Sequence, residues 1–418
     1  AGVTALSDHV VRITLREPDA TLLPILTLGI TAPVCRSAGY EYDPQFDQIA
    51  CGAGPFRLAS WQGRDVLELK RHESYHDASH VHLSGIRWMF GVPSTSQRYR
   101  FERGELDIVH ELTAADSIAF RADPRWAPLG SWSRPRSTRG IFMNTEMPPF
   151  HDVNVRRAIA LAIDRNQIAS LRAGHLVAAN GMIPSGVVGY DPSFSGQQHD
   201  LSQALQLMKR AGWPYDPSTD TGGYPHPIDY YCAADSFDVA VAEIFQQQLQ
   251  RIGIRLRIKA VSWAAYLSVT GRRQQAAMGA DGWSADFDDP SDFFDPLFSS
   301  EAIQQEESQN RAFYNNPRLD SLLARARREM QPNERKKLYH LADGIVRDEA
   351  PWATVYGFRY YDVHQGYVQG YTPHPHAYLD VASVWLSVSQ RTLAARARKA
   401  PPLSIASLAY RLCSGRGR

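Results

Sequence analysis

Long apolar runs and an excess of one charge sign are both missing from this sequence. No stretch approaches the ~18–20 consecutive apolar residues that a membrane-spanning helix needs. The 45 basic and 44 acidic residues give a net charge of +1, without the concentrated basic excess typical of nucleic-acid-binding proteins. With 418 residues, of which 44% are hydrophobic, the chain is long enough to bury more than one core.

Cysteine is also scarce, with four residues at positions 35, 51, 232 and 413. No CxxC pair and no Cys/His spacing typical of zinc sites is present. The segment between Cys35 and Cys51 is polar and rich in turns, which is compatible with a disulfide in an exported protein and equally with two separate thiols. Cys232 lies in the strand-like run PIDYYCA, so we expect it to be a buried thiol.

Signatures of catalysis are missing too. There is no G-x-S-x-G elbow, no H-E-x-x-H, no phosphate-binding Walker loop and no G-x-G-x-x-G after a strand. We therefore expect no catalytic residues and no cofactor. An alternative from another class is a hydrolase that uses paired carboxylates among Asp286, Asp288, Asp289 and Asp292. Such enzymes hold two carboxyl groups ~5–9.5 Å apart across a cleft, an arrangement that four acids on one short loop do not indicate.

Periodicity predicts strands that alternate with helices. Asp152 and Asp200 are typical helix N-caps, the latter with Gln203 in an Asp variant of a capping box. Strands alternating with helices indicate an α/β fold with a largely parallel sheet. The predicted strands are residues 8–16 (half-buried), 66–71, 106–110, 140–144, 227–233, 254–260, 276–283, 352–358 and 360–366. The predicted helices are residues 94–103, 152–163, 201–211, 237–251, 318–330 and 333–348, and one that starts at Trp263.

Two groups of histidines raise the question of a metal site. His72, His76, His80 and His82 have the spacing H-x3-H-x3-H-x-H, and on a helix the first three could bind zinc or nickel. The surrounding sequence has the composition of a loop, which favours surface histidines without metal. His374 and His376, flanked by prolines, are a weaker case. We expect no metal.

An acidic run carries the most specific candidate for a binding site. DGWSADFDDPSDFFDP holds six aspartates between residues 281 and 295, in a spacing that does not match a calcium-binding EF-hand. Asp286 follows the predicted strand 276–283, and ligands of open α/β sheets bind at the carboxyl ends of strands. A carboxylate there could pair with a cationic group such as a peptide α-ammonium, with Trp283 and Phe287 as apolar walls.

Several segments together resemble one family of bacterial transport proteins. They are GAGPFRLASW (52–61), FERGELDIV (101–109), FMNTEMPPFHDVNVRRAIALAIDR (142–165), IPSGVVGYDP (183–192), GWSADFDDPSDFFDPLFSS (282–300) and YNNPRLDSLLARAR (314–327). In this order they resemble the oligopeptide/dipeptide/nickel-binding family of ABC-importer solute receptors, also known as family 5 extracellular solute-binding proteins. The resemblance covers about residues 3–386.

The resemblance implies a two-lobed α/β fold of the type II periplasmic-binding-protein kind, with hinge crossovers. Lobe I would contain residues 1–140 and 356–386, lobe II residues 141–355, and residues 387–418 would form a basic, disordered tail. Compared with the family pattern, the N-terminal strands and small extra domain are expected to be missing, which would leave the first lobe incomplete, and no signal peptide is apparent. Ligand contacts are expected at Asp286, Trp283, Phe287 and Asn144, with Asp286 holding the ligand's α-ammonium.

The implied function is that of a substrate-binding component of an ABC transporter. It would capture short peptides or similar solutes and deliver them to membrane permease subunits, in the periplasm or another extracytoplasmic space. We expect a monomer that binds no nucleic acid. Within the family, a nickel or metal-chelate receptor is the alternative, and a cytoplasmic sensor with an attached DNA-binding domain is a further one. The sequence offers no evident arginine for the ligand's carboxylate.

Overall fold

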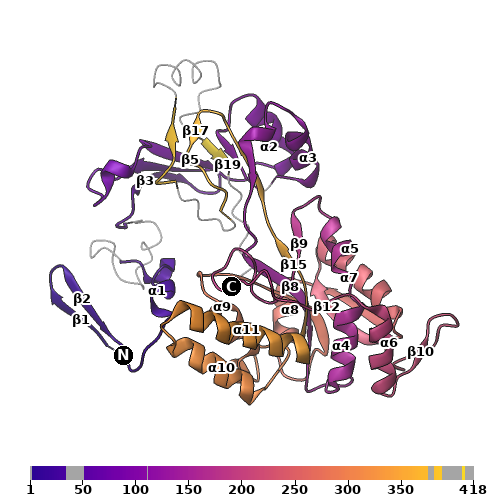
Figure 1. Ribbon diagram of the computed structural model, residues 1–418. Helices are drawn as coiled ribbons and strands as arrows, with labels where there is room; N and C mark the ends of the chain where they lie inside the picture. The colour runs from indigo at the N-terminus through magenta and orange to yellow at the C-terminus, as the bar shows by residue number, and fades with distance from the viewer. Residues whose placement is uncertain (1, 34–50, 111, 375–380, 388–406, 410–418) are drawn as a thin grey trace. The chain divides into compact units, whose positions relative to one another are not determined.

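The computed structural model describes residues 2–33, 51–110, 112–374, 381–387 and 407–409 (Figure 1). The chain divides into two compact units. Unit 1 comprises Ala1–Leu28, Pro135–Leu171 and Leu176–Phe358, and unit 2 comprises Gly29–Arg134, Arg172–His175 and Arg359–Arg418.

These boundaries differ from the expected ones after residues 140 and 355. Both of those positions fall inside strands, β8 (Ser137–Met143) and β15 (Trp352–Phe358). The two strands pair with each other along a continuous antiparallel ladder, so each belongs to unit 1 over its whole length. The first 28 residues also group with unit 1 rather than with residues 29–134.

The core of unit 1 is a six-stranded sheet in the order β13-β12-β14-β8-β15-β9. β12 pairs in parallel with β13 and β14, whereas the pairs β14–β8, β8–β15 and β15–β9 are antiparallel. The predicted α/β class is correct, but the prediction of a largely parallel sheet is wrong. The reason is that β8 and β15 enter from segments remote in sequence rather than through short strand–helix–strand crossovers. The remaining bounds are β9 (Leu176–Ala178), β12 (Ile228–Ala233), β13 (Leu256–Val261) and β14 (Met278–Ser284).

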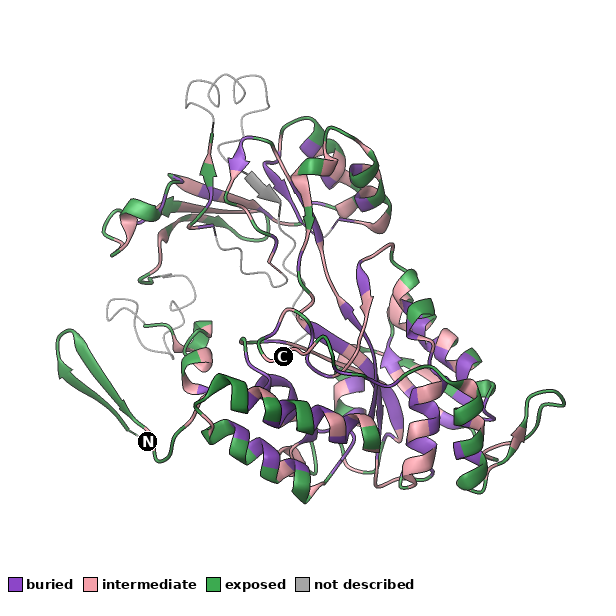
Figure 2. Cartoon of the chain, in the orientation of Figure 1, coloured by how far each residue is buried: buried purple, intermediate pink, exposed green. Residues whose placement is uncertain are grey.

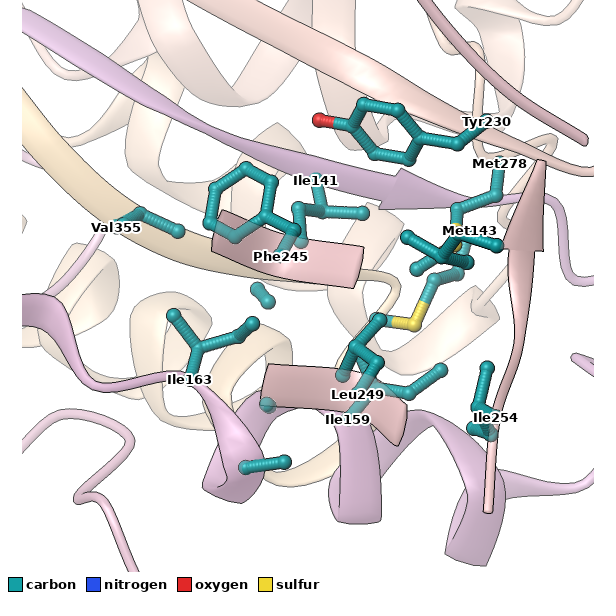
Figure 3. Close-up of a cluster of buried hydrophobic side chains, with 14 of the residues drawn as sticks. Ile141, Met143, Ile159, Ile163, Tyr230, Phe245, Leu249, Ile254, Met278 and Val355 are labelled. Carbon is teal, nitrogen blue, oxygen red and sulfur yellow. The ribbon is translucent and has the colours of Figure 1, made fainter. Parts of the chain in front are cut away.

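Helices cover both faces of this sheet because its strands are apolar on both sides. Ile141 and Met143 of β8 point to a core shared with Ile159, Phe245 and Leu249 of α4 and α7 (Figure 3). Phe142 and Trp352 belong to the opposite core, against α9, α10 and α11. The helices of unit 1 are α1 (Leu22–Ile25), α4 (Val153–Ala162), α5 (Arg165–Ser170), α6 (Leu201–Arg210), α7 (Ser236–Gln250), α8 (Trp263–Thr270), α9 (Ser291–Phe298), η6 (Ser300–Ala302), α10 (Pro317–Arg328) and α11 (Pro332–Glu349).

Side-chain caps start several helices where the sequence predicts them. The Asp152 carboxylate accepts a hydrogen bond from the backbone N–H of Asn154 at the start of α4. The Asp200 carboxylate accepts one from Gln203 at the start of α6. Each cap satisfies a backbone donor that the helix itself leaves without a partner. Both predicted helix starts are therefore confirmed.

The first strands differ from the prediction in their burial. β1 (Gly2–Ser7) and β2 (Val10–Thr14) form an antiparallel hairpin whose residues are all exposed (Figure 2). Val3 pairs with Ile13, and Ala5 with Val11, so one face of the hairpin is apolar. The expected half-buried strand is wrong in this respect, because alternation predicts an amphipathic ribbon but not what packs against it. A second exposed hairpin joins β10 (Tyr215–Asp216) and β11 (Thr221–Gly222).

Unit 2 is built on a seven-stranded sheet in the order β3-β4-β5-β19-β6-β16-β7. Among the described residues no helix is long and apolar enough to cross a membrane. The expected disordered tail falls mostly outside the described residues, but residues 407–409 pair in parallel with β5 and β6 as β19. The strands are β3 (Phe56–Gln62), β4 (Val66–Arg71), β5 (Gly85–Met89), β6 (Ile108–Val109), β7 (Gly130–Trp132), β16 (Tyr361–His364), β17 (Val368–Gln369), β18 (Trp385–Leu386) and β19 (Ser407–Ala409). The helices are η1 (Gly29–Thr31), η4 (Ala78–His80), α2 (Ser94–Glu102), α3 (Ala114–Ala122) and η5 (Ala127–Leu129).

Candidate functional site

The acidic run between β14 and α9 supplies two buried ion pairs. Asp281 accepts hydrogen bonds from the Arg311 guanidinium at 3.0 and 3.1 Å, and the two side chains are only 5% and 7% exposed. The Asp289 carboxylate accepts hydrogen bonds from both terminal nitrogens of Arg335, one of them at 2.8 Å. Charges this deeply buried are stable only when paired, so these aspartates hold the fold together and are not available to a ligand.

Two further aspartates of the run position neighbouring loops. Asp288 accepts a hydrogen bond from the backbone N–H of Val188 at 2.9 Å and lies 3.5 Å from the Arg136 guanidinium. Asp295 forms an ion pair with Arg327 of α10. Four of the six carboxylates thus have structural partners, which removes most of the pairs that the hydrolase alternative would require.

Asp292 is a buried carboxyl group that holds the backbone next to it. Its Oδ2 accepts a hydrogen bond of 2.6 Å from the N–H of Asp286, and the residue is 5% exposed. Burial, the largest cause, and the nearby Asp286 carboxylate together raise the pKa of Asp292 to about 7, against the lowering effect of that N–H. The backbone that carries Asp286 is fixed in this way, while the residue itself is exposed at the end of β14.

The raised pKa of Asp292 makes a testable contribution to stability. Its folded-state pKa lies above the ordinary value of 3.8, so its ionisation destabilises the fold as pH rises from about 4 to about 7. Asp292→Asn cannot ionise at this position. We therefore expect the unfolding free energy of the variant, relative to that of the wild type, to increase by on the order of 2–4 kcal/mol as the pH rises from about 4 to about 7. Urea unfolding across this pH range measures the difference.

Asp216→Asn is the matched control for that experiment. Asp216 is exposed, and hydrogen bonds from Ser218 lower its pKa, so its ionisation is complete before the range begins. From pH 5 to pH 8, where the carboxyl group is also ionised in the unfolded state, the difference between this control and the wild type should stay constant. A constant difference for Asp292→Asn as well would show that Asp292 is ionised throughout.

The other predicted ligand contacts have different environments. Trp283, on β14, packs partly buried against the core of the α9–α11 face, and Phe287 is also partly buried. Asn144 has no exposed surface: its amide donates to the carbonyl of Ala276 at 3.2 Å and accepts from the N–H of Glu146 at 3.1 Å. We therefore assign Asn144 to a structural turn and leave it out of the candidate site, contrary to the expectation from sequence.

Arg139 is a candidate that the sequence alone did not reveal. The register of β8 against β14 pairs it with Gly282, where an added Cβ would lie 2.0 Å from the Arg139 Cδ. Its Nη2 donates to the Ser284 hydroxyl at 3.2 Å, and its guanidinium lies 5.8 Å from the centre of the Phe358 ring. Among the described residues no carboxylate forms an ion pair with it, and its buried Nε has no hydrogen-bond acceptor.

The only signal for Arg139 in the sequence is a charged residue inside the otherwise uncharged strand STRGIFM. A buried donor without a partner calls for an explanation, and an anionic ligand group is one that fits an arginine. A depression of about 50 Å³ beside Ser137, Thr138 and Tyr190 has room for a few water molecules only. Within unit 1 the candidate ligand contacts are therefore Asp286, Trp283, Phe287 and Arg139.

The histidines considered as an alternative metal site do not come together. His72 is buried, with its Nδ1 3.0 Å from the carbonyl of Gly54, whereas His76, His80 and His82 are exposed. In the described part of the chain no three His, Cys, Asp or Glu side chains are grouped so that they could hold a metal ion. His376 lies outside the described residues.

The cysteines agree with the sequence where they can be followed. Cys232 is a buried free thiol, as predicted. Cys51 is disulfide-bonded. Cys35 lies outside the described residues, so its pairing with Cys51 stays a prediction.

Comparison with solved structures defines the class of the protein. The chain is similar to HbpA2 from Haemophilus parasuis, with a TM-score of 0.80 and 22% identity over 93% of this chain and 76% of that one. It is also similar to the periplasmic binding protein DppA from Helicobacter pylori in complex with the peptide STSA, with a TM-score of 0.72 and 24% identity over 93% and 74% of the two chains. The fold is thus that of the two-lobed periplasmic binding proteins, as predicted.

Sequence comparison then identifies the family. Residues 1–305 match the model of the bacterial extracellular solute-binding proteins, family 5 Middle, and the chain belongs to this family. The glutathione-binding protein GsiB of Salmonella typhi is 28% identical over 358 residues, which is 84% of this chain and 67% of the relative. GsiB of Escherichia coli K12 is 27% identical over the same shares. The family recognised from the six motifs is confirmed, and with it the role of a substrate-binding component of an ABC transporter.

Proposed function

We propose that the chain captures short peptides or similar solutes that carry a free ammonium group, and delivers them to ABC permease subunits. The observation that carries this proposal is the exposure of Asp286 just after β14, on a backbone that the buried Asp292 carboxyl group holds in place. A carboxylate with a fixed backbone pairs with a cation without a large loss of conformational entropy. The relatives named as glutathione-binding and the DppA complex with a peptide support the same ligand class.

The second anchor in this proposal is Arg139. The strand residue paired with it, Gly282, precedes Asp286 by four residues, which corresponds to at most ~13 Å along an extended chain. An extended tripeptide or tetrapeptide has a similar length, at ~3.3–3.6 Å per residue. A ligand with an ammonium group at one end and a carboxylate at the other would match Asp286 and Arg139, while Trp283 and Phe287 contact its apolar parts.

The cellular setting follows from the family. Its members are extracellular solute-binding proteins, and for this chain we propose a periplasmic or similar extracytoplasmic location and a monomeric state. The nickel-receptor alternative has no observation in its favour, because the histidines of residues 72–82 do not gather into a ligand set.

Calorimetric titration with pools of dipeptides to pentapeptides tests the proposal. We expect a heat of binding with a Kd on the order of 1 µM, together with a raised melting temperature. The same peptides with acetylated N-termini should bind at least tenfold more weakly, because they lack the ammonium group. If no pool gives either heat or a thermal shift, the chain does not bind peptides.

A further inference from the structure

Two arginines, Arg121 and Arg359, form a cluster with Trp132 in unit 2, and neither belongs to the candidate site of unit 1. The Arg359 guanidinium lies 4.3 Å from the centre of the Trp132 ring system, and the Arg121 guanidinium lies 5.4 Å from it. The His175 ring packs edge-on against the same tryptophan at 5.0 Å. The cluster therefore joins α3, β7, the segment 172–175 and Arg359, the residue directly after β15.

The hydrogen bonds of these arginines go only to neutral acceptors. Arg121 donates to the carbonyl of Ser117 at 3.2 Å and to that of Ala173 at 3.1 Å. Arg359 donates through Nε to the carbonyl of Gly174 at 2.6 Å. A guanidinium has five N–H donors, so most donors of Arg359 have no protein acceptor among the described residues.

The acidic groups on neighbouring elements are already paired. On α3 and just after it, Asp116 caps the helix together with Thr113 and Asp123 binds Arg125 at 2.6 Å. On β16, Asp362 is fully buried against His110 at 2.7 Å. No carboxylate of the described residues lies within ion-pair distance of Arg121 or Arg359. The positive charge of the cluster is therefore not compensated by these elements.

The pKa of His175 is affected by this positive charge. It is 7% exposed, and its Nε2 lies 3.0 Å from the Ser117 hydroxyl. Burial, the largest cause, and the charges of Arg172, Arg121 and Arg359 together lower the pKa of His175 to about 4. The pKa of Arg359 itself is lowered by burial and by Arg121. Arg359 is partly removed from water and has no carboxylate partner among the described residues, which favours the uptake of an anion beside it.

We propose that Arg121 and Arg359, which lie against Trp132, form a binding site for a phosphate group. Phosphate fits because its oxygens match the planar guanidinium fork and its charge at neutral pH offsets more than one cation. The segment 172–175 is a short part of unit 2 flanked on both sides by unit 1 in sequence, and Arg359 is the first residue of unit 2 after β15. A phosphate bound here ties these returning segments to α3 and β7.

The test follows the His175 imidazole by NMR in the full chain, assigned with a His175→Gln variant. Inorganic phosphate is expected to shift the His175 resonances in a saturable manner and to raise its pKa by about one unit, because an anion then lies beside the ring. Sodium chloride at the same ionic strength should leave both unchanged. If phosphate gives no more than the chloride effect, the proposal is overturned.

Variants supply the second part of the test. Arg359→Gln should raise the pKa of His175 in the absence of phosphate and weaken phosphate binding at least tenfold. Arg121→Gln is expected to have the same two effects and replaces Arg359→Gln in the test if that variant folds poorly. Arg125→Gln is the matched control, because its arginine is exposed and paired with Asp123, and it should leave both quantities unchanged. Equal effects of Arg125→Gln and Arg359→Gln would overturn the proposal.

A lipid headgroup offers the same phosphate chemistry as the free ion. Co-sedimentation with vesicles that contain phosphatidylglycerol, lost in Arg359→Gln and not seen with phosphatidylcholine alone, would assign the site to a membrane surface. Binding of inorganic phosphate without co-sedimentation would assign it to a soluble phosphate.

Discussion

Replacing Asp286 with asparagine is expected to weaken the binding of peptides with a free N-terminus by roughly 30- to 150-fold. Loss of one partner from a charge-assisted pair in a binding site costs about 2–3 kcal/mol, and each 1.4 kcal/mol is a factor of ten in Kd. The fold should persist, because Asp286 is exposed and it is its backbone N–H, which the variant retains, that bonds to Asp292. Calorimetry on the variant and the wild type measures the change.

The same experiment can separate the two ends of the ligand. N-acetylation of a peptide should weaken its binding to the wild type, but should not weaken its binding to Asp286→Asn any further. In the same way, C-terminal amidation should weaken binding to the wild type but not to Arg139→Gln. Asp288→Asn is the matched control, since it removes a charge from the same loop and should change Kd less than threefold. If Asp288→Asn and Asp286→Asn weaken binding equally, the loop acts through its total charge and Asp286 is not the specific contact.

The largest loss of stability is expected when the Arg311–Asp281 pair is broken. Asp281→Ala leaves a guanidinium that is 7% exposed without its carboxylate, 5.7 Å from the Tyr266 ring. An uncompensated buried charge of this kind destabilises a fold by about 3–5 kcal/mol. Urea unfolding followed by tryptophan fluorescence should show the midpoint shifted accordingly.

Two further variants test whether the stability loss of Asp281→Ala is caused by the burial of the Arg311 charge. Glu334→Gln breaks an exposed ion pair with Lys337, and should cost less than about 1 kcal/mol. The double variant Asp281→Leu with Arg311→Met removes both buried charges and should recover much of the lost stability. If Asp281→Ala were as mild as Glu334→Gln, the Arg311 charge would have to be hydrated in the folded state.

Local structure was predictable because its determinants lie close together in the sequence. Asp152 and Asp200 cap their helices through residues two or three positions further on, so a short window contains the whole interaction. Alternation located β4 at Val66–Arg71, the same bounds as predicted. Six ordered motifs identified the family without any tertiary information.

The candidate site could be predicted only in part. Asp286 was predicted as a ligand contact because it follows a strand in a recognisable motif, and the structure adds only that it is exposed there. Arg139 was missed because its significance depends on the pairing of β8 with β14, which joins Arg139 to Gly282, 143 positions further along the chain. Asn144 was misjudged for a similar reason, since its amide contacts a carbonyl 132 positions away.

The sequence by itself determined where helices and strands form, the α/β class and the family, because these depend on periodicity, caps and short motifs. Only the tertiary structure decided that the sheet contains both parallel and antiparallel pairs, that the β1–β2 hairpin is exposed, and which aspartates of the acidic run pair with arginines. Whether a carboxylate meets a buried arginine, as Asp281 and Asp289 do, or is exposed, as Asp286 is, depends on which remote segment packs against it. Composition and spacing therefore do not predict which aspartate is paired and which is exposed.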